Sequence, residues 1–168
     1  AGARQPLSFL PERFQAPYYL TGDDFLRYLL SLHNVRHDDQ AVQHILAALE
    51  LAPAALRRPA RTYSKGMMQK LGLAACWLSG KRQLVLDEPM SGLDPKARAQ
   101  FKQVLRQAQA QGRGDLFTSH ALADVDGRIM YVDDGSTDAT WAVLRVLAAS
   151  DSRVALLRLS RNFGKEAA

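Results

Sequence analysis

Two adjacent carboxylates, Asp87 and Glu88, are the residues of this sequence best placed to do chemistry. They follow the apolar run Gln83–Leu86, which is typical of a short buried β-strand, and they precede Pro89. The carboxyl ends of strands are where open α/β sheets bind their ligands. There, one carboxylate can hold a divalent cation and a second can polarise a water molecule. Taken alone, such a pair more often caps a helix or lies on the surface, so the prediction depends on the motifs around it.

Three further motifs accompany this acidic pair in a fixed order along the chain. Ser64–Gly66 (SKG) precedes an apolar helical stretch, Ser91–Asp94 (SGLD) follows the acidic pair, and Thr118–His120 (TSH) follows a later strand. A hydroxyl, the bare backbone N–H of a glycine and a helix N-terminus together make an anion site, to which Lys65 adds positive charge. Taken alone, the SKG motif would be an ordinary helix N-cap.

In this order, the motifs resemble those of the ATPase subunit of ABC transporters. The resemblance implies that Asp87 holds Mg²⁺ at the phosphates of ATP and that Glu88 polarises the attacking water. Residues 63–67 (YSKGM) stand in the place of the family's signature, normally LSGGQ, of which only Ser64 and Gly66 match. In the family this signature contacts the γ-phosphate of ATP bound by the opposite subunit, which implies a homodimer.

Other residues take their expected roles from the same resemblance. Asp94 resembles the loop aspartate that communicates across the dimer. His120 resembles the switch histidine that senses the γ-phosphate, and it is expected to be catalytic together with Glu88. The run Phe9–Arg13 (FLPER) resembles the loop that couples nucleotide state to the membrane partner, with Glu12 where glutamine is usual. The expected ATP-binding residues are Tyr63, Ser64, Lys65, Gly66, Asp94 and Glu12.

The partner and the location are also expectations from this resemblance. Residues 17–62 correspond to the family's helical subdomain, whose surface loops dock on transmembrane subunits. We therefore expect a transmembrane transporter subunit as partner, contacted through this subdomain and Phe9–Arg13. The expected location is cytoplasmic, peripheral on the inner face of the cell membrane, and no nucleic-acid partner is expected. FLPER together with YSKGM is typical of bacterial exporter-type subunits.

The phosphate-binding loop of such ATPases, G-x-x-x-x-G-K-[ST], does not occur in the sequence. Only Gly80–Lys81 and Gly164–Lys165 supply the glycine–lysine pair, and neither has the required flanking residues. In the family this loop lies upstream of the FLPER position. We therefore expect the chain to be cut inside an ATPase domain and inactive alone, with ATP and Mg²⁺ bound only if the loop is supplied.

The C-terminal third carries a second resemblance. Residues 132–140 (VDDGSTDAT), a helical stretch and residues 157–168 (LRLSRNFGKEAA) resemble inverting glycosyltransferases that move sugars from nucleotide donors to polyprenyl phosphates. The sugar-nucleotide-binding residues implied by this alternative are Asp133, Asp134, Arg161, Asn162 and Lys165. An acidic turn is the other explanation for the DDGS segment taken alone. We interpret the chain as a chimera or fusion of two incomplete enzymes, joined near residues 127–135.

These motifs need an α/β framework to position them. Strands are expected at Leu7–Leu10, Gln83–Leu86, Leu116–Thr118, Ile129–Val132 and Val154–Leu159. Helices are expected after Asp23 or Asp24, around Val42–Leu49, over Gly66–Leu78, from Pro95 to near Gly112 and around Trp141–Leu147. With the first resemblance, this alternation implies an incomplete P-loop-NTPase-like α/β fold with a mostly parallel sheet and an inserted helical subdomain. The expected segments are 1–16 (strand and coupling loop), 17–62 (helical subdomain), 63–130 (signature helix to switch histidine) and 131–168 (glycosyltransferase-like).

Composition narrows the class of protein without identifying it. The chain has 168 residues, 47% of them apolar and 23% charged, which excludes a fully disordered or fibrous protein. Its net charge of +5 is spread along the sequence and argues only weakly for an acidic partner. The single cysteine, Cys76, excludes a disulfide framework and is expected to be buried. The longest apolar run, around Leu71–Leu78, is far shorter than the ~18–20 residues that cross a bilayer. No signal segment is recognised, and the first residue is Ala1 rather than Met, which is consistent with processing or truncation.

Overall fold

The computed structural model describes residues 7–118, 128–133 and 135–159. The chain divides into two compact units, Ala1–His120 and Ala121–Ala168. None of the helices in the described residues is long and apolar enough to cross a membrane.

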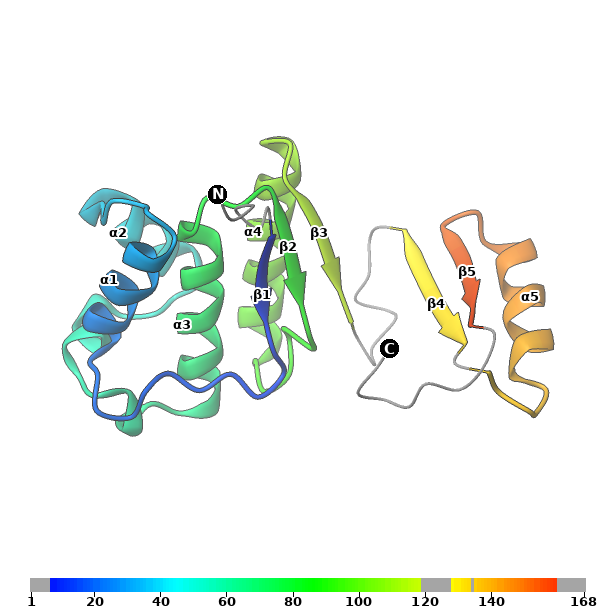
Figure 1. The fold of residues 1–168 in the computed structure, drawn as a ribbon, viewed down its shortest axis with the longest axis horizontal. Coiled ribbons are helices and arrows are strands. Elements are labelled where there is room, and N and C mark those ends of the chain that lie inside the picture. Colours follow the sequence, from blue (N-terminus) through cyan, green and yellow to red (C-terminus); the bar gives the residue numbers. More distant parts are fainter. Residues whose placement is uncertain (1–6, 119–127, 134, 160–168) are drawn as a thin grey trace. The chain divides into compact units, whose positions relative to one another are not determined.

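The first unit is built on three parallel strands in the order β1 (Leu7–Leu10), β2 (Gln83–Leu86) and β3 (Gly114–Phe117) (Figure 1). The parallel sheet and the bounds of β1 and β2 agree with the sequence-based prediction. The expected start of β3 at Leu116 was wrong, because the strand begins at Gly114, whose amide donates to the Arg82 carbonyl at 2.9 Å. That bond starts the pairing with β2 immediately after the turn that follows α4 (Pro95–Ala110).

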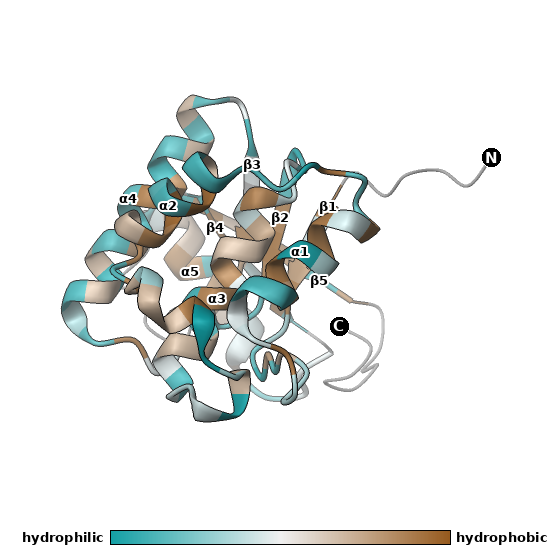
Figure 2. Cartoon of the chain, turned by 90° about the vertical axis from the view of Figure 1, so that its left-hand side faces the viewer, coloured by the Kyte–Doolittle hydropathy of each residue, from teal (hydrophilic) through white to brown (hydrophobic). Residues whose placement is uncertain are grey.

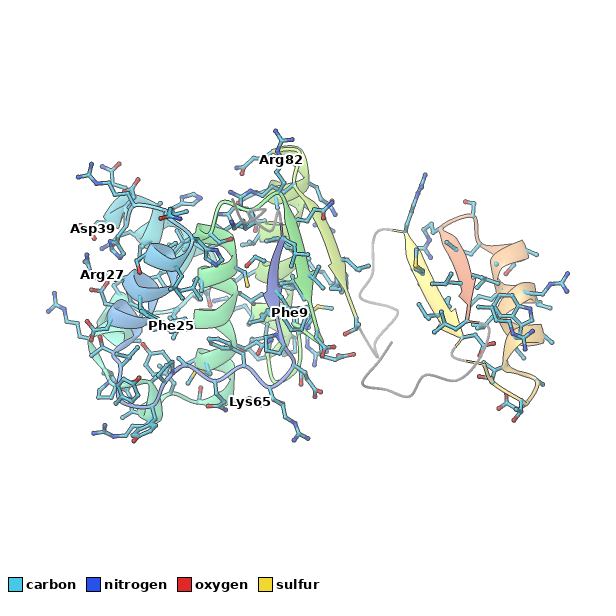
Figure 3. All side chains as sticks on the ribbon, in the orientation of Figure 1. Phe9, Phe25, Arg27, Asp39, Lys65 and Arg82 are labelled. Atoms are coloured by element: carbon cyan, nitrogen blue, oxygen red, sulfur yellow. The ribbon has the colours of Figure 1, made fainter. Side chains whose placement is uncertain are left out.

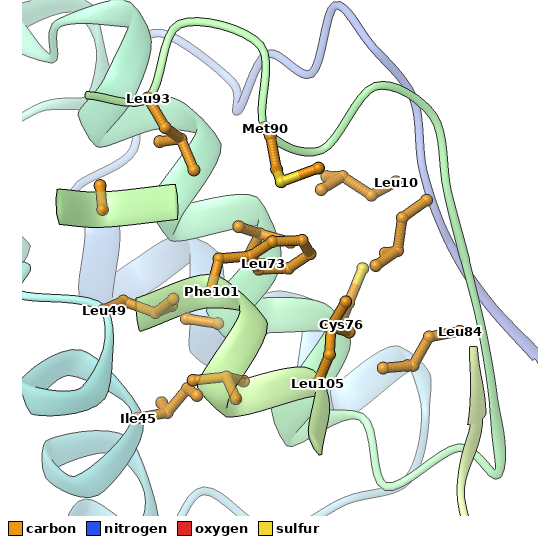
Figure 4. Packing of buried hydrophobic residues seen from close by; sticks show 14 residues of the cluster. Leu10, Ile45, Leu49, Leu73, Cys76, Leu84, Met90, Leu93, Phe101 and Leu105 are labelled. Atoms are coloured by element: carbon orange, nitrogen blue, oxygen red, sulfur yellow. The ribbon is translucent and has the colours of Figure 1, made fainter. Parts of the chain in front are cut away.

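Helices α3 (Lys65–Leu78) and α4 cover one face of this sheet. Figure 4 shows side chains of these helices packed against those of the strands, with Cys76 close to Leu10 and Leu84. Phe101, 1% exposed, fills the centre of this core, and Cys76 is buried as predicted. Side chains alternate between the two faces of a strand. On the face opposite these helices, Phe9, Val85 and Leu116 lie side by side on the three neighbouring strands. The described helices thus cover only one side of the strands.

A helical part lies beside this core and joins it through α3. It contains α1 (Gly22–Leu32), α2 (Asp39–Ala48) and the short 3₁₀ helices η1 (Pro53–Arg57) and η2 (Ala60–Thr62). The apolar spacing predicts both longer helices, and Figure 2 shows that α2 carries both hydrophilic and hydrophobic residues. The N-cap of α1 is Thr21 rather than Asp23 or Asp24, because Asp24 sits at the third helical position and closes a capping box with Thr21.

The second unit contains two parallel strands, β4 (Ile129–Asp133) and β5 (Val154–Arg158), connected by α5 (Thr140–Ser150). All three elements were predicted. Helix α5 contacts both strands, yet it has no buried residue, and Val146 is 72% exposed. A helix that is apolar on both faces but buried on neither is marginally stabilised by its own unit.

Candidate functional site

The acidic pair lies at the carboxyl end of β2, as predicted. The Asp87 amide continues the pairing with β1 by donating to the Leu10 carbonyl at 2.8 Å. Directly beyond β3, the Thr118 hydroxyl donates to Asp87 Oδ1 at 2.7 Å and accepts from the Glu88 amide at 2.8 Å. One hydroxyl from a neighbouring strand therefore fixes the side chain of Asp87 and the backbone of Glu88 at once.

Glu88 adopts a backbone conformation that non-glycine residues rarely take. Its φ is +43°, in the left-handed region, which costs an L-residue roughly 1–2 kcal/mol. The Ser91 amide donates to its carbonyl at 2.9 Å and closes a turn. The following Pro89 and Met90 are buried and anchor that turn in the core. Strained residues persist where their surroundings hold them, and they cluster at functional sites.

The SGLD loop (Ser91–Asp94) leads from this turn into α4. Gly92 has a φ of +76°, which a residue with a side chain adopts only with strain. Asp94 is the N-cap of α4, and its Oδ1 accepts a hydrogen bond from the Ala97 amide at 2.8 Å. That bond lowers the pKa of Asp94, because it stabilises the charged carboxylate.

The SKG turn (Ser64–Gly66) begins α3 and contacts the SGLD loop. Ser64 is the N-cap and accepts from the Met67 amide at 3.2 Å. Lys65 Nζ donates to Ser91 Oγ at 3.1 Å, and Figure 3 shows Lys65 at the end of the unit where β1 and β2 finish. The structure thus brings together two motifs that the sequence separates.

Tyr63, just before this turn, is directed into the helical part. Its hydroxyl donates to the Ala55 carbonyl at 2.7 Å. Burial raises the pKa of the Tyr63 hydroxyl, because the charged phenolate would lose its hydration. The Tyr63 hydroxyl thus already has a partner within its own unit, as do the side chains of Ser64, Lys65 and Asp94.

Glu12 is exposed in the turn after β1, and no hydrogen bond of its side chain occurs among the described residues. Because β1 and β2 are parallel neighbours, Glu12 leaves the sheet at the same edge as the acidic pair. His120, the expected switch histidine, lies outside the described residues. The same holds for four residues expected to bind a sugar nucleotide: Asp134, Arg161, Asn162 and Lys165.

The site at the end of β2 suits a cation that keeps most of its water. In the part of the chain that the structure describes, no group of three or more His, Cys, Asp or Glu side chains could hold a metal ion. Thr118 engages only Oδ1 of Asp87, so Oδ2 can accept from a hydrated cation. Mg²⁺ fits this donor set, because it retains several waters and uses one or two carboxylates together with substrate phosphates.

In the second unit, Asp133 ends β4 and is 2% exposed. Its Oδ1 accepts from the Ser136 amide at 3.0 Å, and Arg158 Nε lies 3.2 Å from its Oδ2. Hydrogen bonding from Ser136 is the main cause that lowers the pKa of Asp133, and the charge of Arg158 adds to it. The Arg158 guanidinium also lies 5.2 Å from the centre of the Trp141 ring. Asp133 is thus engaged in holding its own unit together.

Thr118 was recognised from the sequence as part of the TSH motif without being given a role, and Gln69 was missed as part of the site. Gln69 is 3% exposed, and its side-chain amide donates to the Pro89 carbonyl at 3.3 Å. The signal for Thr118 was the strand register, because a residue just after β3 lies beside the residue just after β2. A glutamine on an otherwise apolar stretch of α3 was the signal for Gln69.

Comparison with known proteins supports both resemblances. The family model described as ABC transporter matches residues 3–91, and that of glycosyl transferase family 2 matches residues 118–168. Over 127 residues the chain is 36% identical to an uncharacterised ABC transporter ATP-binding protein of Synechocystis sp., covering 73% of this chain and 36% of that protein. Over 129 residues it is 36% identical to the fluoroquinolones export ATP-binding protein of Mycobacterium tuberculosis, covering 75% of this chain and 41% of that protein.

The chain therefore spans less than half the length of these curated relatives. Its fold is similar to that of a solved dimeric bacterial ABC transporter cassette, with a TM-score of 0.64 and 18% identity. The similarity covers 72% of this chain and 55% of the cassette, and it confirms the predicted α/β fold of the P-loop NTPase type. With a family match over residues 3–91 and this fold, the chain belongs to the ABC transporter family.

Proposed function

We propose that the first unit is the hydrolysis half of an ATP-binding subunit of an exporter-type ABC transporter. The observation that carries this proposal is the acidic pair at the end of β2, whose Asp87 side chain and Glu88 backbone are both fixed by Thr118. Placing charged groups before the substrate arrives avoids reorganisation during the reaction. The relatives named as ATP-binding proteins, including one named for fluoroquinolone export, support the same function.

In this proposal the two carboxylates have different tasks. Mg²⁺, when bound with ATP, neutralises charge on the phosphates that are separated in the reaction. Asp87 holds that ion, chiefly through water, with the oxygen that Thr118 leaves accessible. Glu88 orients the attacking water and accepts a proton from it, as a general base does, which leaves the electron pair on the attacking oxygen. His120 completes the catalytic set as the residue that senses the γ-phosphate.

The SKG turn and the SGLD loop form the part of the site that faces a second subunit. Ser64, Lys65 and Gly66 offer a hydroxyl, a cation and backbone N–H groups at the N-terminus of α3, which suits the γ-phosphate of ATP held by that subunit. Asp94, beside them, communicates across the dimer. Tyr63 shapes this turn through its packing on the helical part, and Glu12 contacts water or metal from the turn after β1.

The partner is a transmembrane transporter subunit, reached through the helical part and the Phe9–Arg13 loop. Exposed aromatic side chains support this assignment: Tyr18 is 70% exposed, and Tyr28 on α1 is 55% exposed. Aromatic residues on a surface favour protein contacts, because they bury a large area at low entropic cost. In this arrangement the first unit lies on the inner face of the cell membrane.

The glycosyl transferase family 2 match over residues 118–168 favours a second candidate function for the second unit. In it, Asp133 and Asp134 hold the nucleotide of a sugar donor, and Arg161, Asn162 and Lys165 line the donor side. Asp133 is already paired with Ser136 and Arg158, so its part would be to shape this strand end for a donor.

Nucleotide selectivity tests these proposals on the 168-residue polypeptide. Without a G-x-x-x-x-G-K-[ST] sequence it should bind Mg-ATP no more tightly than about millimolar, because phosphate binding in this family depends on that loop. Preceding it with the phosphate-binding segment of the Mycobacterium tuberculosis relative should bring tight, magnesium-dependent binding of ATP but not of UDP- or GDP-sugars. Preference for a sugar nucleotide would favour the second candidate, and no nucleotide binding by the extended chain would refute the first.

A further inference from the structure

The start of α3 contacts the backbone segment that follows the acidic pair at two points. Lys65 Nζ donates to Ser91 Oγ at 3.1 Å, and the Gln69 side-chain amide donates to the Pro89 carbonyl at 3.3 Å. Lys65 and Gln69 are four positions apart on α3, so both side chains lie on one face of the helix. The same helix face thus holds the segment Pro89–Ser91 at both of its ends.

The Gln69 contact is made inside the protein. Gln69 is only 3% exposed, and it is a polar residue among buried apolar ones on α3, such as Met68 and Leu71. A buried amide is retained only where it finds a partner, since an unpaired one costs free energy of desolvation. The partner here is the carbonyl of the residue directly after Glu88.

The Lys65 contact relies on close approach as well as on a hydrogen bond. A Cβ atom added to Gly92 would lie 3.0 Å from Lys65 Cδ, so the aliphatic stem of Lys65 packs against the Gly92 backbone. A Cβ atom added to Gly66 would lie 3.3 Å from the Gly92 carbonyl oxygen. Two glycines therefore let α3 and the SGLD loop approach closely enough for the lysine to reach Ser91.

These contacts bear directly on Glu88. The left-handed φ of Glu88, +43°, is held by two hydrogen bonds of its backbone. Its amide donates to the Thr118 hydroxyl, and its carbonyl accepts from the Ser91 amide, which closes a turn. If Pro89 and Ser91 were released, the backbone could relax toward an unstrained conformation and turn the Glu88 carboxylate away. The family signature has glycine at the position of Lys65, and glycine cannot make this contact.

We propose that Lys65 and Gln69 form a clamp that holds Pro89–Gly92 and thereby positions the carboxylate of Glu88. They are positioning residues, since they act on the reaction through Glu88. That the placement of the Glu88 carboxylate matters for catalysis rests on the hydrolytic role proposed for Glu88. The clamp itself is a property of the folded chain and does not depend on that role. The two can therefore be tested apart.

Amide hydrogen exchange on the full chain, read residue by residue by NMR, tests the clamp without any nucleotide. The variants Lys65→Met and Gln69→Met keep an unbranched side chain of similar length but lose its donor. The Leu93 amide donates to the Met90 carbonyl at 3.2 Å and therefore reports on the clamped segment. We expect the Glu88 and Leu93 amides to exchange about five-fold faster in either variant, which is the effect of losing one hydrogen bond on a local opening. The α1 amides should be unchanged, and Lys81→Met, just beyond the other end of α3, serves as the matched control.

Two further variants separate a clamp from a general loss of stability. Lys65→Arg can still donate to Ser91 and should restore slow exchange. In the double variant of Lys65→Met and Ser91→Ala, Leu93 should exchange no faster than in either single variant, because both remove the same bond. Additive effects, or no rescue by arginine, would contradict the Lys65 contact.

The proposed clamp is refuted if the Glu88 and Leu93 amides exchange as slowly in Lys65→Met as in Lys81→Met. It is also refuted if Lys65→Met accelerates the exchange of all amides equally. Should Gln69→Met fail to fold, the Lys65 variants decide the question by themselves. ATP hydrolysis plays no part in this measurement. If the chain shows the clamp but does not hydrolyse ATP after it is extended with a phosphate-binding segment, the proposed function is refuted and the clamp still stands.

Discussion

Replacing Thr118 by valine removes the hydroxyl that fixes the acidic pair but keeps the size and branching of the side chain. Valine has the same shape and the same preference for extended backbone as threonine. It loses the 2.7 Å bond to Asp87 Oδ1 and the 2.8 Å bond from the Glu88 amide. A hydrogen bond contributes about 0.5–1.5 kcal/mol net, and both of these lie near the surface, where water replaces part of the loss. We expect the free energy of unfolding of the first unit to fall by about 1–2 kcal/mol.

Urea unfolding followed by tryptophan fluorescence measures this change. The chain has two tryptophans, Trp77 in the first unit and Trp141 in the second, so a Trp141→Phe background reports the first unit alone. With a slope of roughly 2 kcal/mol/M, the midpoint should fall by about 0.5–1 M. Thr118→Ser keeps the hydroxyl and should unfold close to the parent. A valine variant as stable as the serine variant would refute the role given to this hydroxyl.

Three further predictions concern strain, pH and the second unit. Glu88→Gly should be more stable than Glu88→Ala by about 1 kcal/mol in urea unfolding, because only glycine accepts a φ of +43° without strain. Equal stability would contradict the strain. A lowered pKa means that ionised Asp94 stabilises the fold above its ordinary pKa of 3.8, and that this contribution is lost as the pH falls below it. The urea midpoint of Asp94→Ala should therefore trail the parent at pH 7 and approach it below about pH 4, while Asp94→Asn, a neutral N-cap, should vary less. Limited proteolysis should cut first between Asp133 and Ala168, since α5 has no buried residue; strongest protection there would overturn this expectation.

Local sequence patterns predicted most of the elements that position the site. The apolar run Gln83–Leu86 is β2 with the expected bounds, and Ser64 caps α3, because strand patterning and N-capping depend on neighbouring residues only. The start of β3 was misplaced at Leu116, because strand pairing with Gln83 extends it to Gly114. The division of the chain into functional segments stays a prediction.

Contacts between distant segments could not be read from the sequence. The roles of Thr118 and Gln69 depend on which strands and helices are neighbours and on their register. The link from Lys65 to Ser91 spans two motifs that sequence reasoning treated as separate. Tyr63 matched the start of the signature by position, but its hydroxyl bond to Ala55 follows from how η1 packs beneath it.

The most direct test of the central claim is single-turnover hydrolysis of Mg-ATP by the chain extended with the phosphate-binding segment of a relative, with and without Glu88→Gln. Glutamine can still hold a water molecule but cannot take up its proton as a carboxylate does. We predict that ATP stays bound and that the hydrolysis rate falls about 10²- to 10⁴-fold. Hydrolysis by the glutamine variant at the rate of the parent would contradict the assignment of the acidic pair, and with it the proposed ATPase function.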